Sequence, residues 1–520
     1  MSIRKEIEAR DGTAFPGRTY AETVLAPVYE TARQHLLEPL VEVHRAHLVM
    51  LAETGLIPRE QGQAIARALR ALDLEALARS RYDGRYEDLF FCVEDHLLRT
   101  AGEVAGNLHI GRSRNDMGVT LYRLVLRERL LGALEAAVGL HAALLEVAEQ
   151  HAETVMLAYT HTQPAQPTTL GHWLLAAADV LARDIRRLIR AYEEANRSPM
   201  GAAALGTTGF AIDRERVAEL LGFDGVVENA YDAVAAADYL GSAAAAVELA
   251  AIDMGRVVQD FLLWATQEFG AIRVADAYVQ CSSIMPQKRN PVSLEHCRAL
   301  LSSAAGSAAA VLQMLHNTPF GDIVDTEDDL QPHLWRALEA FGNALRLLTA
   351  VVATLEVRAD RLLERARASY ASVTELADSL VREHGIPFRQ AHRVVSAAVR
   401  EALARGIEDV RRVPSALWEE AAARVLGRPL RLDPERVRQA LDPEHFVAVR
   451  RVRGGVAPAE VRRMLADRQG RHQDLVRWLR EARDRLERAR AKLDAAFAAL
   501  AGGQGYGAEG GAAAQGREAP

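Results

Sequence analysis

The residues best suited to chemistry lie between Cys281 and Pro291, in the sequence Cys-Ser-Ser-Ile-Met-Pro-Gln-Lys-Arg-Asn-Pro. Ser282 and Ser283 supply hydroxyl groups, Lys288 an ammonium group and Asn290 an amide that both donates and accepts hydrogen bonds. Two prolines within the stretch disfavour a continuous helix. These groups suit a small molecule rich in carboxylates. The alternative is a polar surface loop between two helices.

Four motifs together resemble one enzyme family. Ser-Ser-Ile-Met-Pro-Gln-Lys-Arg-Asn-Pro resembles the signature loop of the fumarase/aspartase superfamily, whose members eliminate fumarate from succinyl-type substrates. Gly111–Asp116 (Gly-Arg-Ser-Arg-Asn-Asp) and Tyr159–Pro167 (Tyr-Thr-His-Thr-Gln-Pro-Ala-Gln-Pro) resemble its argininosuccinate lyase branch, and Gly385–His392 is similar to the C-terminal domain of that branch. The resemblance implies an all-α, three-domain fumarase/aspartase-like fold with a central bundle of long helices.

The implied reaction removes a weakly acidic proton beside a carboxylate and expels an amine. It needs a base, hydrogen-bond donors for the dianionic aci-carboxylate and a proton for the nitrogen, but no metal or organic cofactor. The resemblance makes Ser282 the base, with a pKa lowered by Lys288 and by backbone N–H groups of the loop. It also places Lys288 and Asn290 against substrate carboxylates, with Ser283 and Met285 lining the loop.

His161 is the second candidate. A single histidine in a Thr-His-x-Gln-Pro loop is often a structural or capping residue. The resemblance instead assigns His161 to acid/base work at the leaving group and Thr160 to carboxylate binding. Histidine titrates near neutrality, which suits proton delivery to a departing amine.

The third candidate is the basic loop Gly111–Asp116, which precedes a long stretch that is expected to be helical. One interpretation is helix capping, with Asn115 or Asp116 as the N-cap. A helix N-terminus beside an arginine also binds carboxylates. The resemblance implies that Ser113, Arg114 and Asn115 bind substrate and that a different subunit supplies Ser282.

The chain departs from the argininosuccinate lyase pattern in three places. Cys281 replaces the usual glycine, and ungapped counting places Tyr29 where an N-terminal serine contacts substrate. After the signature loop, ungapped counting puts Asp322, Glu327 and Leu330 where the family has Tyr, Gln and Lys.

The acidic replacements predict a leaving group that carries amine cations, provided that the segment faces the pocket. A surface acidic loop is the alternative. The combination resembles ethylenediamine-disuccinate lyase, which releases fumarate from an aminopolycarboxylate. We therefore expect a carbon–nitrogen lyase acting reversibly on an N-substituted L-aspartate. A genuine argininosuccinate lyase, which releases L-arginine and fumarate, stays open, as does a non-catalytic, crystallin-like relative.

The length and composition of the chain narrow the class of protein and its expected location. A chain of 520 residues predicts about three domains. The net charge of −7 disfavours a nucleic-acid binder. Three scattered cysteines indicate neither a disulfide framework nor a zinc site and favour a reducing compartment. Without an apolar run of about 18 residues or a signal-peptide pattern, we expect a cytoplasmic protein with no membrane partner.

Helical periodicity sets the expected organisation. Long helices are predicted over about 169–196 and 233–268 and after Pro291. Their Ala- and Leu-rich faces need partners, and the resemblance implies a homotetramer with a central twenty-helix bundle. The expected parts are an N-terminal helical domain (1–110, beginning with a loose arm over 1–18), the bundle domain (111–365), a small helical domain (366–500, ending in a charged helix over 471–500) and a disordered tail (501–520).

Overall fold

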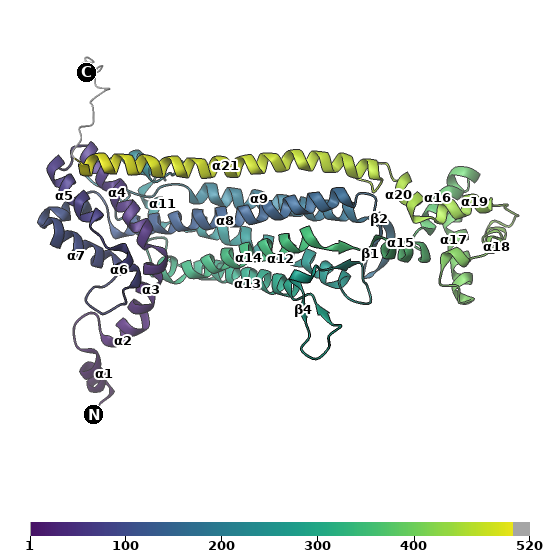
Figure 1. Cartoon of the computed structure of the whole chain (residues 1–520), viewed down its shortest axis with the longest axis horizontal. Helices are drawn as coiled ribbons and strands as arrows, with labels where there is room; N and C mark the ends of the chain where they lie inside the picture. The colour runs from purple at the N-terminus through teal and green to yellow at the C-terminus, as the bar shows by residue number, and fades with distance from the viewer. Residues whose placement is uncertain (1, 503–520) are drawn as a thin grey trace, which may run out of the picture.

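A five-helix bundle forms the centre of the computed structural model, which describes residues 2–502 (Figure 1). Each helix packs against the next, and the last returns to the first, so that the five close a ring. The helices are α8 (Arg114–Gln150), α9 (Leu170–Ala195), α12 (Asp238–Trp264), α13 (Val292–Leu315) and α14 (Gln331–Thr354). The expected all-α bundle of long helices is confirmed.

Apolar stripes at helical spacing create this packing. On α9 the side chains of Leu181, Ile185 and Leu188 are fully buried, whereas the arginines of the same helix face outward. Gly171, at the start of α9, permits a close approach to the end of α8. A Cβ atom there would lie 2.6 Å from the carbonyl oxygen of Ala148.

The N-terminal elements form a separate cluster at one end of the bundle (Figure 1). The first helix is exposed and begins at residue 3 of the chain, so the arm expected over 1–18 is partly ordered. The elements are α1 (Ile3–Asp11), α2 (Arg18–Tyr20), η1 (Ala21–Leu25), α3 (Ala26–His35), α4 (Leu37–Glu53), α5 (Arg59–Arg70), α6 (Leu74–Arg79), α7 (Leu89–Ala101) and η2 (Glu103–His109). Two short helices, α10 (Arg214–Leu220) and α11 (Ala230–Ala235), lie between α9 and α12 in the chain.

A small helical unit with its own core lies at the opposite end (Figure 1). Trp418 is the largest side chain buried there. Its elements are α15 (Ala359–Ala368), α16 (Val373–His384), α17 (Phe388–Ala404), η5 (Val410–Arg412), α18 (Ser415–Leu426), α19 (Pro434–Leu441) and α20 (Pro443–Val449).

The last helix differs from the expected one. α21 begins at Pro458 rather than near residue 471 and runs for 45 residues to Gly502. Proline is accepted in a first helical turn, where its missing N–H costs nothing, so Pro458 starts the helix instead of interrupting it. α21 leaves the small unit, lies along α8 and ends against α4 and α5 (Figure 1). Residues 501 and 502 of the expected tail belong to this helix, and 503–520 lie outside the described residues.

Within residues 2–502 the strands form three antiparallel pairs. They are β1 (Val155–Thr160) with β2 (Gln163–Thr169), β3 (Ile272–Arg273) with β6 (Glu356–Val357), and β4 (Gln280–Cys281) with β5 (Arg289–Asn290). The first and third pairs carry candidate site residues at their turns.

Two helical stretches are long and apolar enough to cross a membrane by length and composition alone. They are α8 and residues 325–354, and their most apolar windows are 72% and 56% buried inside the protein. Packing in the bundle accounts for the apolarity of both.

Candidate functional site

The Gly111–Asp116 loop is fixed by its own capping interactions. Ser113 is the N-cap of α8, and Asp116 completes a capping box, which corrects the expectation that Asn115 or Asp116 is the cap. The buried Asp116 carboxylate accepts hydrogen bonds from the backbone N–H groups of Ser113 (2.8 Å), Gly201 (2.7 Å) and Ala203 (2.9 Å). Gly111 has a φ of +70°, and a Cβ there would lie 2.6 Å from Ile212.

Two of the three substrate-binding candidates on this loop contact acidic groups. The Nδ2 group of Asn115 donates a hydrogen bond to the Asp322 carboxylate, and its Oδ1 accepts one from the Ser113 hydroxyl. Arg114 pairs with Asp88 at 2.9 Å and is about half exposed. The loop therefore presents a hydroxyl, an amide and a guanidinium group at the start of α8.

The acidic segment lies beside this loop. Residues 325–329 form a single wide helical turn, η4 (Asp325–Asp329), before α14. Glu327 is half-buried, and burial, followed by the adjacent Asp322, raises its pKa to about 8. Burial also raises the pKa of Asp328, whose carboxylate accepts a hydrogen bond from Tyr122 at 3.3 Å. Within residues 2–502, Asp322, Glu327 and Asp328 form no ion pair, and Asp322 and Glu327 lie beside the Asn115 end of α8 rather than on a free surface loop.

His161 and Thr162 form the two-residue turn between β1 and β2, where Thr160 pairs with Gln163. Both turn residues adopt left-handed conformations, with φ of 52° and 62°. Such conformations are costly for residues other than glycine and are common at functional sites. The Thr160 and His161 side chains are exposed. Farther along β2, Gln166 lines a cavity of roughly 350 Å³ with Phe388 and His392 of the fourth motif.

The signature motif is a hairpin that projects from the bundle (Figure 1). Ser282 is half-buried, and its hydroxyl oxygen accepts hydrogen bonds from the backbone N–H groups of Ile284 (3.3 Å) and Met285 (3.1 Å). These donors stabilise negative charge on that oxygen. Ile284 is 83% exposed, and the Lys288 side chain is also exposed. Of the remaining candidates on the hairpin, Ser283 and Met285 have exposed side chains, and Asn290 is half-buried.

One chain does not bring the candidate residues together. Asn115 lies at the start of α8, and His161 follows shortly after its end. The 37 residues of α8 make the helix about 55 Å long. The hairpin that follows β4 projects sideways from the bundle, in the half of the molecule that is nearer β1 and β2 (Figure 1).

Several residues near the loop were not predicted from the sequence. Tyr122 lies seven residues after Asn115, two turns along the same face of α8, so helical spacing alone could have found it. Left-handed conformations at Ala203, Leu205 and Thr207 had no sequence signal, because none of these residues is glycine.

Tyr29, predicted at the position of a substrate-contacting serine, is buried and hydrogen-bonds to Ser80 at 2.7 Å.

No group of three or more His, Cys, Asp or Glu side chains within residues 2–502 is arranged to hold a metal ion. The chemistry available at the site comes from hydroxyl, imidazole, ammonium, guanidinium, amide and carboxyl groups.

Comparisons with known proteins identify this chemistry. A lyase family model matches residues 51–306, and a model of the argininosuccinate lyase C-terminal region matches 370–448. Argininosuccinate lyase 2 of Agrobacterium fabrum is 42% identical over 467 residues, which are 89% of this chain and 92% of that protein. The crystal structure of EDDS lyase in complex with formate superposes with a TM-score of 0.84 at 32% identity, covering 96% of this chain and 98% of that one. A variant of EDDS lyase with bound fumarate gives the same values.

The bundle, the signature hairpin and these relatives define a lyase of the fumarase/aspartase type. The chain belongs to the argininosuccinate lyase branch of the fumarase/aspartase superfamily. It is a carbon–nitrogen lyase that releases fumarate and acts on small molecules.

Proposed function

We propose that the protein cleaves an N-substituted L-aspartate whose departing amine carries a positive charge, such as an aminopolycarboxylate of the ethylenediamine-disuccinate type. The observation that carries this proposal is the Asp322–Glu327 pair beside Asn115. Within residues 2–502 neither carboxyl group has an ion-pair partner, so a cationic leaving group would supply one. The similarity to EDDS lyase over nearly the whole chain supports the same substrate class.

Ser282 removes the Cβ proton of the succinyl group in this proposal. Its oxygen already accepts two backbone hydrogen bonds that stabilise an alkoxide, and Lys288, six residues farther along the hairpin, adds positive charge. The electron pair left on the carbon moves onto the adjacent carboxylate as an aci-carboxylate, held by Lys288 and Asn290. As this dianion collapses, the C–N bond breaks, and His161 donates a proton to the amine. Fumarate remains.

Residues from all three of the separated motifs hold the succinyl carboxylates in this proposal. Ser113, Arg114 and Asn115 provide donors at the N-terminus of α8, where the helix dipole favours an anion. Thr160 contributes a hydroxyl beside His161, and Ser283 and Met285 line the hairpin. Closure of the hairpin over the substrate would exclude water and assemble the base only on the bound molecule.

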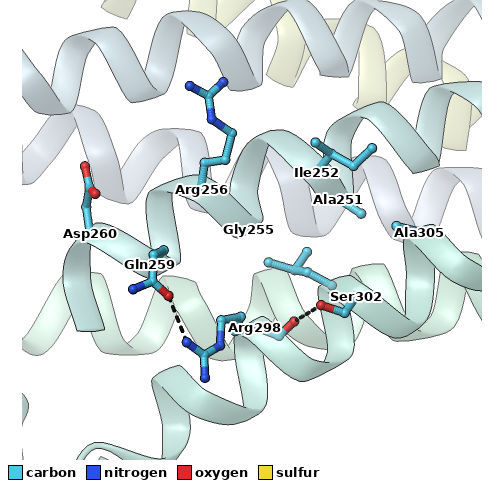
Figure 2. Close-up of a pocket in the computed structure, with 10 residues that line it drawn as sticks. Ala251, Ile252, Gly255, Arg256, Gln259, Asp260, Arg298, Ser302 and Ala305 are labelled. Atoms are coloured by element: carbon cyan, nitrogen blue, oxygen red, sulfur yellow. Dashed lines mark hydrogen bonds between the residues drawn. The ribbon is translucent and has the colours of Figure 1, made fainter. Parts of the chain in front are cut away.

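The separation of these motifs in one chain supports an association of several copies. We propose a homotetramer in which the Gly111–Asp116 loop, the His161 turn and the signature hairpin that meet in one site come from different subunits. A groove of roughly 470 Å³ between α12 and α13 offers a surface on which a helix of a second copy could pack closely (Figure 2). Small residues such as Gly255 and Ala305 line it, and Arg298 donates to Gln259 across it at 2.8 Å. The exposed Ile252 on its rim gives a second copy apolar surface to cover. We place the assembled enzyme in the cytoplasm.

Ultraviolet absorption by fumarate provides the test. The enzyme is incubated with ethylenediamine disuccinate, argininosuccinate and aspartate, and in the reverse direction with fumarate and the corresponding amines. We expect turnover only with N-substituted aspartates and the highest kcat/KM where the amine carries a further cation. Ser282→Ala should abolish turnover but preserve assembly, whereas Ser283→Ala should retain some. No release of fumarate from any succinyl amine would contradict the proposal.

A second candidate is argininosuccinate itself. The observation in its favour is the 42% identity to an argininosuccinate lyase, above the 32% identity to EDDS lyase. The guanidinium group of the departing arginine is also a cation that Asp322 and Glu327 could pair with. The relative kcat/KM values for the two substrates decide between these candidates.

A further inference from the structure

A buried positively charged residue, Arg112, immediately precedes the Ser113–Asn115 loop in the chain. Arg112 is only 7% exposed, and its guanidinium group donates a hydrogen bond to Nδ1 of His44 at 3.0 Å. The Nε group of Arg112 is buried without a hydrogen-bond partner, and within residues 2–502 Arg112 forms no ion pair. A desolvated charge with so few partners is costly, which makes Arg112 unusual in a folded protein.

The groups around Arg112 do not neutralise it. His44 and His47 face it from α4, and His109 faces it from η2. Burial, followed by the charge of Arg112, lowers the pKa of all three imidazoles, so they are neutral near pH 7. His47 is already engaged, since its Nε2 lies 2.8 Å from the carbonyl oxygen of Ile110.

The two carboxylates that act on Arg112 also fail to neutralise it. Asp116 and Glu94 stabilise the charged form of Arg112 from a distance, but burial outweighs them and lowers its pKa to about 9. The Asp116 carboxylate is occupied by three backbone N–H groups. Arg112 therefore stays charged at neutral pH without a direct negative partner.

We infer that Arg112, which is hydrogen-bonded to the imidazole of His44, is a positioning residue whose unpaired charge draws a substrate carboxylate to the Ser113–Asn115 loop. The Cα atoms of consecutive residues are about 3.8 Å apart, so the backbone of Arg112 adjoins that of Ser113, which is proposed to bind the anion. Because Arg112 is buried, solvent screens its charge less than it would screen that of an exposed arginine. This inference rests on the proposed binding of the succinyl group at that loop.

Arg112→Met tests the inference, because methionine fills similar space without charge. We expect KM and the fumarate dissociation constant to rise about 10- to 100-fold, with a much smaller change in kcat. The urea midpoint should not fall, because a buried unpaired charge has been removed. A merely structural arginine would behave oppositely, with a lower midpoint and unchanged affinity, and that result would overturn the inference.

Two substitutions of His44 provide a matched pair and a test that does not depend on the folding of Arg112→Met. His44→Asn keeps a hydrogen-bond acceptor near the Nδ1 position, and His44→Phe keeps the ring without one. We expect His44→Asn to bind fumarate nearly as well as the wild type and His44→Phe to bind it about tenfold more weakly. Equal affinities for the two variants would refute the role of His44.

Direct binding measurements separate this inference from the proposed function. Fumarate binding is followed by calorimetry, and turnover by absorbance. If the wild type neither binds fumarate nor cleaves a succinyl amine, the proposed function fails. If the wild type does both and Arg112→Met binds fumarate equally well, only the positioning role of Arg112 fails.

Discussion

The side-chain amide of Asn115 donates a hydrogen bond to the carboxylate of Asp322 across 207 positions of sequence. This contact joins the start of α8 to the segment that departs most from the argininosuccinate lyase pattern. Because the Asn115 Oδ1 atom accepts from Ser113, the amide is held at both ends. The acidic departure therefore adjoins a residue proposed to bind substrate.

Asp322→Asn should remove the preference for a cationic leaving group. We expect kcat/KM for a substrate with a further ammonium group to fall about tenfold or more relative to one with a neutral amine, because Asp322 supplies the negative charge of a pair in which Glu327 keeps its proton. Asp325→Asn is the matched control, since Asp325 is exposed in the same segment. An unchanged ratio for Asp322→Asn, or an equal loss in both variants, would show that the segment does not select the amine.

The stability of the protein should depend on the proton held by Glu327. Burial and Asp322 raise the pKa of this carboxyl group to about 8 from the ordinary value of 4.5. Between these two values the folded protein keeps a proton that the unfolded chain has released. The contribution of Glu327 to the free energy of unfolding is therefore complete below about pH 4.5 and is lost as the pH rises through about 8. The free energy of unfolding, measured with urea from pH 5 to 9, should decline as the pH rises, and the decline should be shallower in Glu327→Gln. Parallel curves for the variant and the wild type would contradict this assignment.

The sequence predicted the parts of this protein that depend on local chemistry. Apolar spacing placed α9 within a residue at each end, and Pro-containing polar sequence placed the signature hairpin outside any helix. It could not decide whether Asp322 faces Asn115, because that contact depends on how α14 returns to α8. The prediction that the last helix begins near residue 471 also failed, because the packing of its earlier part, from Pro458, along α8 is not visible in the sequence.

Asp116→Asn should destabilise the fold more than it alters chemistry. The carboxylate accepts three backbone hydrogen bonds, two of them from Gly201 and Ala203, whereas an asparagine amide nitrogen would oppose at least one of those N–H groups. We expect a loss of about 2 to 4 kcal/mol in the free energy of unfolding. Asp213→Asn is the control, because an exposed N-cap position accepts asparagine equally well. Similar small losses in both variants would mean that Asp116 does not anchor the loop.

Mixing two inactive variants should restore activity if the site is shared between subunits. Ser282→Ala removes the proposed base and His161→Gln the proposed acid, so each homogeneous oligomer should be inactive. If the hairpin and the His161 turn of one site come from different subunits, as proposed, some sites of a mixed oligomer combine an intact hairpin with an intact turn. We expect fumarate release to appear after joint unfolding and refolding. The control is the double variant Ser282→Ala/His161→Gln mixed with Ser282→Ala, which contains no intact hairpin and should remain inactive. If the single-variant mixture also stays inactive although mass spectrometry shows mixed oligomers, both groups belong to one subunit in each site.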